Sequence, residues 1–347
     1  MILANLAIGR SWAHHVIALL AGFTAGITFL LGAIDLAGAD LFPTAVVGAY
    51  RLPLDISLMT TAVVAALLAS KPVRERLARI MPIDPDNPVH ALALVLAILL
   101  LGMQLATFAF LSSPSQSNQS APPGIGDLIA GDLSLLILAV AGVGLFIRRN
   151  ISVTATRLGF VVPAWWHVVL ALASAGVFFA FIEAMDVLSH AWTPGVARQV
   201  DTNVQQLFGG FDNPAGIVAL ALVPGLCEES LFRGALQPRL GLILPALLFT
   251  SLHTQYSVSL ILLAVLVVAI GLGLIRKFTN TTTSSICHVT YNLLTSIGVA
   301  GSLTTGAIGI EVVLVAVSAY AIWAHLRRRA PAGAVLTPRV GENQNGE

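Results

Sequence analysis

Charged residues are scarce in this sequence. Of its 347 residues, only 10% are Asp, Glu, Lys or Arg, whereas a soluble domain carries about 25%. The formal net charge of +1 predicts no basic surface for a nucleic acid. Two cysteines, Cys227 and Cys287, are too few for a disulfide framework. These shortages exclude an ordinary soluble domain, a nucleic-acid-binding protein and a disulfide-rich scaffold.

Long apolar runs fill the chain instead. The hydrophobic fraction is 56% and the mean hydropathy is +0.87. Successive windows of about 18 or more apolar residues are typical of a membrane protein that crosses the bilayer several times. The sequence therefore predicts an all-α, polytopic transmembrane helical bundle of about ten spans. The predicted spans are residues 12–36, 55–70, 88–112, 127–146, 163–188, 214–237, 242–256, 260–275, 284–303 and 308–323.

The first run has a second interpretation. Ala37-Gly38-Ala39, which follows it, resembles a signal-peptidase site. However, the run exceeds the apolar core of about 7–15 residues in a signal peptide, and we interpret it as a span. Two polar segments are predicted to be unstructured, an exposed turn at 113–126 and a disordered tail at 330–347.

Lys and Arg gather in the connections after the second, fourth, eighth and tenth predicted spans. Cytoplasmic loops of membrane proteins carry an excess of these residues. We therefore expect a multi-pass protein of the bacterial cell membrane with both termini in the cytoplasm. The basic clusters are at residues 71–79, 148–149, 276–277 and 327–329.

One predicted span contains three charges within six residues. Residues 224–233 read Pro-Gly-Leu-Cys-Glu-Glu-Ser-Leu-Phe-Arg, and each ionisable group at membrane depth costs about 2.5–3.5 kcal/mol. Glu229 and Arg233 are four residues apart on a helix, so they can neutralise each other. Glu228 points about 100° away and has no partner nearby in the sequence. A paired glutamate with a free glutamate beside it predicts a functional site.

Later spans add histidine and asparagine. His288 and Asn292 are four residues apart and therefore face one side of a helix. At about 1.5 Å per residue, Glu228 and His253 each lie roughly 15–17 Å from the cytoplasmic end of their spans, and the His288–Asn292 pair roughly 6–12 Å. We expect all four to meet near mid-membrane or in the cytoplasmic half.

These residue types suit hydrolysis by water. A carboxylate can take a proton from water, and a histidine can hold the water or pass the proton on. A His-Asn pair on one helical face can donate hydrogen bonds to a developing oxyanion, which contributes about 10²–10³ in rate per donor. Phe249, four residues before His253, is expected to pack rather than react.

Three motifs on separate spans now resemble a known family. In order, they are Glu228-Glu229-x-x-x-Arg233, Phe249-x-x-x-His253 and His288-x-x-x-Asn292. Together they are similar to the motifs of the CPBP family, the CAAX-protease and bacteriocin-processing intramembrane endopeptidases, which include the type II CAAX prenyl endopeptidases. The resemblance covers roughly residues 160–305.

The resemblance implies an intramembrane endopeptidase without an obligatory metal. It implies that Glu228 activates the attacking water with His253, and that His288 and Asn292 stabilise the oxyanion. The supporting residues would be Glu229, Arg233 and Phe249. The substrate would be a peptide or membrane-tethered polypeptide, cut near the cytoplasmic side of the bilayer. Four regions follow from this: N-terminal spans at 1–160, a protease core at 161–305, a last span at 306–329 and the tail at 330–347.

Several alternatives stay open on the sequence alone. A zinc site could use the two glutamates and two histidines, although no His-Glu-x-x-His is present. A transporter or a bacteriocin-immunity factor could hold the same groups, although internal repeats are not evident. Each cysteine precedes a site residue, but a small buried side chain is the simpler interpretation than a nucleophile. Glu183 and Asp186 are expected at the interface or in helix packing, with an access path as the lesser alternative.

Overall fold

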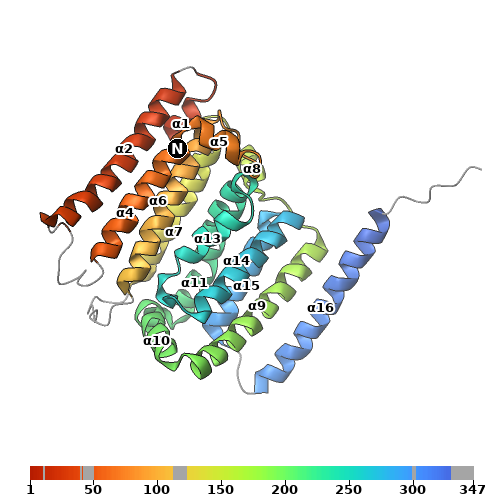
Figure 1. Ribbon diagram of the computed structural model, residues 1–347. Coiled ribbons are helices and arrows are strands. Elements are labelled where there is room, and N and C mark those ends of the chain that lie inside the picture. Colours follow the sequence, from red (N-terminus) through yellow and green to blue (C-terminus); the bar gives the residue numbers. More distant parts are fainter. Residues whose placement is uncertain (11, 40, 42–50, 112–122, 299–301, 330–347) are drawn as a thin grey trace, which may run out of the picture.

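Most of the described residues are helical. The computed structural model describes residues 1–10, 12–39, 41, 51–111, 123–298 and 302–329. These described residues contain no β-sheet, and their long helices run side by side, alternating in direction (Figure 1). The all-α, polytopic bundle predicted from the sequence is confirmed. The predicted tail at 330–347 and most of the predicted turn at 113–126 lie outside the described residues.

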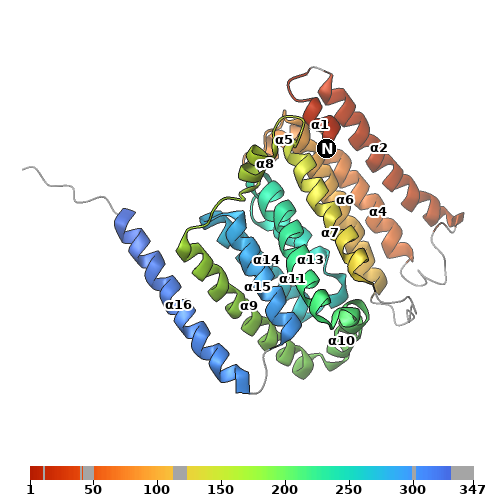
Figure 2. The ribbon, with the colours of Figure 1, turned by 180° about the vertical axis from the view of Figure 1, so that it is seen from behind.

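The N-terminal helices form one group of the bundle. Four long helices pack beside one another, and the short helices α1, α5 and α8 lie at one end (Figures 1 and 2). The elements are α1 (Ile2–Leu6), α2 (Ala13–Ile34), its π-helical end η1 (Asp35–Ala39), α4 (Arg51–Ala69), α5 (Lys71–Leu77), α6 (Pro88–Leu111), α7 (Ile125–Val143) and α8 (Ile151–Leu158).

The second group carries all of the predicted site residues. Helices α9, α11, α13, α14 and α15 pack together, and α16 lies on the outside against α9 (Figure 1). The elements are α9 (Trp165–Trp192), α10 (Pro194–Phe208), η3 (Gly209–Phe211), α11 (Pro214–Glu229), the π-helical η4 (Ser230–Leu236), α12 (Gln237–Leu240), α13 (Ile243–Ser251), η5 (Thr254–Tyr256), α14 (Leu260–Phe278), α15 (Thr281–Ile297) and α16 (Ser302–Arg329).

Side-chain caps mark where several helices begin. A side-chain oxygen accepts a hydrogen bond from the backbone N–H three residues later, at 2.9 to 3.2 Å, in α8, α11, α14 and α15. Such a cap satisfies one of the N–H groups that a helix start leaves unpaired. The capping residues are Asn150, Asn213, Ser259 and Asn280.

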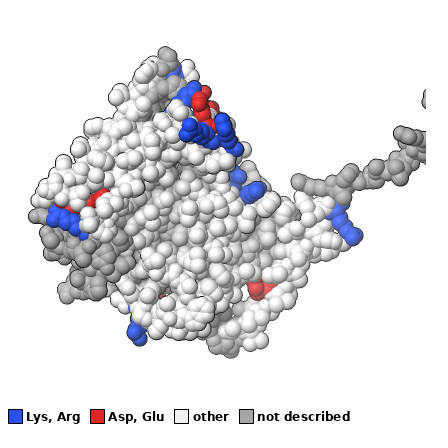
Figure 3. Space-filling view, viewed as in Figure 1, with Lys and Arg blue, Asp and Glu red and all other residues white. Residues whose placement is uncertain are grey.

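The outer surface is apolar where a soluble protein would be charged. Leu19 and Val187 are each 71% exposed. Most of the charged side chains visible in Figure 3 lie toward the ends of the helices, and the surface between them is almost free of charge. Since the helices satisfy their own backbone hydrogen bonds, this belt can face lipid. The protein is an integral membrane protein.

Among the described residues, eight helices are long and apolar enough to cross a membrane, where the sequence predicted about ten. The two differences are the predicted spans at 242–256 and 284–303. In the first, α13 has 9 residues and ends at Ser251, and in the second, α15 has 17 residues. A full crossing takes about 20 residues. Both helices nevertheless lie among the long ones in Figures 1 and 2.

The two groups share a core. Buried side chains of α6 and α7, including Leu94 and Ala139, belong to the same apolar cluster as Phe232 and Phe249. The side-chain amide of Gln104 in α6 also donates to the Ser251 carbonyl, at 3.1 Å. The core therefore crosses the predicted boundary at residue 160, and the division into functional regions stays a prediction.

Candidate active site

The two neighbouring glutamates end α11. Glu229 is fully buried, and its Oε1 lies 3.1 Å from a guanidinium nitrogen of Arg233. This is the ion pair that the spacing of four residues predicts. Arg233 also donates to the Ala269 carbonyl of α14 at 3.2 Å, so the pair is anchored to a neighbouring helix. The π-helical η4 starts at the next residue, and single π-helical turns are frequent at functional sites.

His288 lies between the two carboxylates. Its Nδ1 is 3.1 Å from Oε1 of Glu229, and its Nε2 is 3.9 Å from Oε2 of Glu228. The same Oε2 of Glu228 is buried and has no hydrogen-bond partner among the described residues. Oε2 of Glu229 is likewise buried without a hydrogen-bond partner. The two carboxylates differ because Oε1 of Glu229 contacts Arg233 and His288 at 3.1 Å, whereas Glu228 has only the longer contact with His288.

The ring of Phe249 contacts Arg233, His253 and His288. Its ring lies 4.3 Å from the guanidinium carbon of Arg233, a cation–π distance. The rings of His253 and His288 approach it to 4.7 and 5.7 Å between centroids. His253 Nδ1 lies 2.9 Å from the Phe249 carbonyl oxygen. Because a carbonyl only accepts, Nδ1 carries the proton, and the Nε2 of neutral His253 is left as an acceptor.

Asn292 has a structural partner that follows from a proline. Pro224 lies inside α11 and has no N–H, so it cannot donate to the carbonyl of Leu220, four residues earlier. The Asn292 side-chain amide donates to that carbonyl instead, at 3.2 Å. The amide still has a second N–H. One proline in α11 thus positions an asparagine of α15.

A glycine sets how closely these two helices approach. A Cβ at Gly225 would lie 2.5 Å from Cγ2 of Val289 and 3.1 Å from its backbone nitrogen. Real Cβ atoms do not come that close, so α11 and α15 meet at this level only because residue 225 has no side chain. His288 is the neighbour of Val289 and is brought beside the glutamates by this contact.

The predicted catalytic residues line one cavity of about 680 Å³. This volume lies in the range of about 300–1,000 Å³ that is usual for ligand sites. Glu229 and Arg233 are not part of the lining and lie behind it. The cavity brings together Glu228, Phe249, His253, His288 and Asn292.

Three further lining residues escaped the sequence analysis. Asp132 of α7 is 9% exposed and adds a carboxylate to the same cavity. It could have been found, because an acidic residue within a predicted span is unusual. Tyr256, stacked on His253 at 6.1 Å between ring centroids, and Tyr291 also line the wall. Nothing in the local pattern distinguishes these tyrosines from ordinary packing.

The exposed part of the lining lies at the end of the bundle beside α10 and η3, away from α5 and α8 (Figures 1 and 2). Glu183 and Asp186 were expected at the interface or in packing, and they line the cavity here. The mouth is acidic, and the lining includes no Lys or Arg among the residues described. Its exposed polar side chains are Glu183, Asp201, Gln205, Asp212 and Thr295.

In the part of the chain that the structure describes, metal-ligating side chains come close together at one place, beside this mouth. Within the described ranges, one group of three has its donor atoms within 4.8 Å of one another, namely Asp186, His190 and Asp201. His190 contacts both carboxylates, at 3.5 and 3.1 Å, so it links α9 to α10 without an ion. The glutamates and histidines of the cavity do not form such a group. Both cysteines are buried and free.

The fold and the cavity together define a polytopic helical membrane protein with polar groups collected inside the bundle. The family model described as type II CAAX prenyl endopeptidase Rce1-like matches residues 211–294. An uncharacterized protein of Bacillus subtilis (strain 168), YpbD, is 31% identical over 149 residues, which are 42% of this chain and 74% of that protein. No solved structure matches.

The chain belongs to the Rce1-like family of type II CAAX prenyl endopeptidases. This family is one of membrane proteases, in agreement with the resemblance that the three motifs carry. The matched segment contains Glu228, His253, His288 and Asn292 of the cavity, and Glu229 behind it.

Proposed function

We propose that this protein is an intramembrane endopeptidase in which Glu228 activates water. The observation that carries the proposal is the unpaired, buried Glu228 Oε2, which faces a cavity shared with His253, His288 and Asn292. An acceptor without a partner, in a cavity large enough for solvent, is where a water molecule would be bound and deprotonated.

The chemistry follows from the partners of each side chain. Glu228 takes a proton from water while the water oxygen attacks the peptide carbonyl carbon, and Nε2 of His253 accepts the second water hydrogen. Because Glu229 holds Nδ1 of His288, the other ring nitrogen, Nε2, is directed toward Glu228, and it is the group of His288 that donates to the oxyanion. The remaining N–H of Asn292 donates to it as well. The C–N bond then breaks, and the proton on Glu228 passes to the leaving amine.

We infer the substrate class from the mouth of the cavity. A strip of carboxylates without cations favours a polypeptide segment that carries Lys or Arg. Prenylation of the substrate is not required by this reasoning. The lipid bilayer is the other partner of the protein.

We further propose that the protein lies in a bacterial cell membrane with both termini in the cytoplasm. The arginine-rich end of the bundle would then face the cytoplasm, and the cavity would open on the opposite side. The sequence led us to expect a cut near the cytoplasmic side. We now favour access from the other face, because the exposed lining residues are at the end away from α5 and α8.

The test is cleavage of internally quenched decapeptides by the purified protein in detergent, with lysine-rich and uncharged peptides compared. We expect Glu228→Gln and Glu228→Ala to lose about 10²–10⁴ in rate, the usual contribution of a general base. Glu75→Gln, at an exposed position of α5, is the matched control and should cleave normally.

Two results would change the proposal. If both Glu228 variants fold and cleave like the parent, Glu228 is not the base. If a chelator abolishes cleavage and added Zn²⁺ restores it, a metal mechanism with the same residues replaces the glutamate one.

A further inference from the structure

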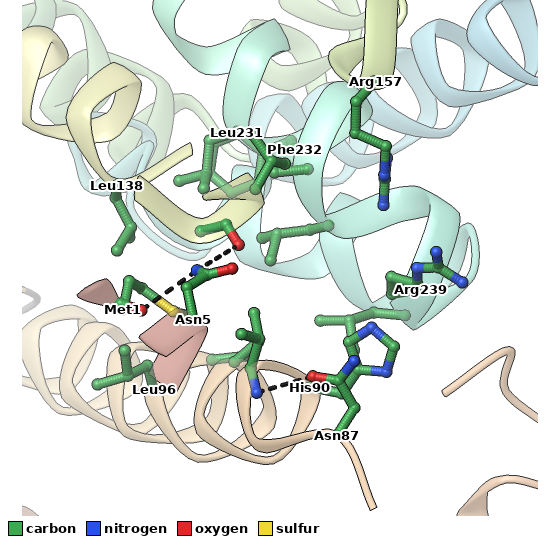
Figure 4. Close-up of a pocket in the computed structure, with 18 of the residues that line it drawn as sticks. Met1, Asn5, Asn87, His90, Leu96, Leu138, Arg157, Leu231, Phe232 and Arg239 are labelled. Atoms are coloured by element: carbon green, nitrogen blue, oxygen red, sulfur yellow. Dashed lines mark hydrogen bonds between the residues drawn. The ribbon is translucent and has the colours of Figure 1, made fainter. Parts of the chain in front are cut away.

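A second pocket lies on the opposite side of η4 from the glutamates. Its volume is about 170 Å³, and it shares no lining residue with the larger cavity. Helices α1, α6, α7 and α8 form one side of it, and η4, α12 and α13 form the other. Figure 4 shows residues of both groups, such as Leu96 and Phe232, facing the same space.

The pocket is strongly basic. Its lining contains four arginines and no carboxylate, and none of the four has an ion-pair partner in the part of the chain that the structure describes. Burial, together with Arg239 and Arg149, lowers the pKa of the Arg157 guanidinium to about 10. Because these arginines have no counter-charge, they repel one another, and a bound anion would reduce that repulsion. The four are Arg148, Arg149, Arg157 and Arg239.

Two neutral side chains add directional groups. Asn5 is 3% exposed, and its Nδ2 donates to the carbonyls of Ala141 and Gly142 at 2.8 and 3.1 Å. Its Oδ1 is buried without a partner and turns toward the middle of the pocket (Figure 4). Nδ1 of His90 accepts from the Asp84 N–H at 2.9 Å, so its Nε2 carries the proton and can donate. The pocket thus offers donors for a phosphate and an acceptor for a hydroxyl.

The remaining walls are apolar, and the pocket has the size of a headgroup. Alanine and leucine side chains of α6 and η4 make up most of these walls. A cavity of about 150 Å³ accepts a molecule the size of benzene, so this pocket holds a phosphate ester and not a whole lipid. It lies at the arginine-rich end of the bundle near α1 and α8 (Figure 1), where headgroups of the adjacent leaflet would be.

We propose that this pocket binds the headgroup of an anionic phospholipid that carries a free hydroxyl. The phosphodiester lies between Arg157 and Arg239, and the hydroxyl donates to Asn5 Oδ1. The acyl chains remain outside, along the apolar surface of the bundle. A soluble phosphate ester has the same chemistry and is the other source that the experiment distinguishes.

The proposal assigns a task to the N-terminal helices. The ligand would connect α1, α6 and α8 to η4, the segment that contains Arg233 of the larger site. It does not depend on the protein being a protease, and its test is one of binding.

The experiment is thermal unfolding of the delipidated full-length protein in detergent. It is titrated with dihexanoyl phosphatidylglycerol, phosphatidylmethanol or phosphatidylcholine, or with glycerol 3-phosphate. We expect phosphatidylglycerol to raise the Tm most, with phosphatidylmethanol weaker because it lacks the hydroxyl. Arg157→Gln with Arg239→Gln should weaken the apparent affinity by about 30-fold. Arg76→Gln with Arg79→Gln, which removes two exposed arginines at the same end, should not.

The outcomes separate cleanly. The proposal fails if phosphatidylcholine protects as well as phosphatidylglycerol, or if the Arg157 and Arg239 variant binds as tightly as the parent. Arg157→Lys with Arg239→Lys keeps both charges, and it should retain most of the effect if charge is the cause. Equal protection by glycerol 3-phosphate would keep the phosphate site and assign it to a soluble ligand.

Discussion

Glu228 and Glu229 are adjacent residues in very different surroundings. Each has one oxygen without a hydrogen-bond partner, but Glu229 contacts Arg233 and His288 at 3.1 Å and lies behind the cavity, whereas Glu228 lines the cavity. One carboxylate is therefore part of the framework, and the other is available to a ligand. This difference is a property of the residues around them, since the two side chains are chemically identical.

A stability measurement should separate the two. Glu229→Gln leaves the buried Arg233 without its counter-charge, and breaking a buried ion pair costs about 3–5 kcal/mol. Glu228→Gln removes a buried carboxylate whose contact with His288 is longer, at 3.9 Å, and should cost clearly less in the free energy of unfolding. Denaturant unfolding in mixed micelles is the measurement. Equal losses in the two variants would contradict the assignment of separate roles.

Asn292 and Pro224 should be energetically coupled. Asn292→Ala leaves the Leu220 carbonyl unpaired, at a cost of about 1–3 kcal/mol. With Pro224→Ala, residue 224 regains an N–H that can donate to that carbonyl. The loss caused by Asn292→Ala should then shrink by about 1 kcal/mol. The four proteins of this cycle are compared by unfolding, and strictly additive effects would show that the proline does not explain the contact.

Much of the site was accessible from residue spacing. The separation of Glu229 from Arg233 predicted their ion pair, and the depth of each group along its helix predicted that Glu228, His253 and His288 meet. Both are local rules of helix geometry. Asp132 joins from a helix that has none of the motifs, and the link between Pro224 and Asn292 depends on how two helices pack. That Asp132 reaches this cavity, and that Asn292 pairs with the Leu220 carbonyl, cannot be obtained from one helix alone.

At the scale of elements, the close contact of α11 and α15 is the feature that the site depends on. Gly225→Ala would place a Cβ 2.5 Å from Val289 Cγ2. We expect a loss of about 1–3 kcal/mol in stability, as for overpacked cores, and a fall in cleavage because His288 moves with Val289. Val289→Ala should restore part of both.

The matched control for this prediction is another helical glycine. A Cβ at Gly131 of α7 meets nothing within 4 Å. Gly131→Ala should therefore keep or slightly raise stability, since alanine favours a helix by up to about 1 kcal/mol. If Gly225→Ala is as well tolerated as Gly131→Ala, residue 225 does not determine how closely α11 and α15 pack.

The number of spans shows why the ends of a helix are harder to predict from the sequence than the presence of the helix. Hydropathy extended the helix containing His253 to residue 256, but α13 ends at Ser251, and the chain turns through η5, where Ser257 has a φ of 49°. The ending lets His253 leave the helix and turn its ring onto Phe249. An apolar run predicts that a segment is buried in a bundle. It does not show where within that segment the helix ends and the chain begins to line a cavity.

At the scale of the whole molecule, the two ends of the bundle differ in charge. The end near α5 and α8 (Figure 1) carries the arginines of the smaller pocket, of which Arg157 and Arg239 are labelled in Figure 4. The other end carries the carboxylates of the cavity mouth. By the positive-inside rule, this difference predicts that the arginine-rich end faces the cytoplasm. The position of the mouth relative to the arginines then decides from which compartment a substrate segment can enter.

Labelling of single cysteines in intact cells tests that orientation. Thr295→Cys lies at the cavity mouth and Arg76→Cys at the arginine-rich end, and both positions are exposed. The native Cys227 and Cys287 are 7% and 0% exposed, so background reaction should be low. A membrane-impermeant maleimide should label Thr295→Cys from outside and Arg76→Cys only after permeabilisation. The reverse pattern would open the cavity to the cytoplasm and return the cut to that side, because the geometry inside the bundle is independent of how it is inserted.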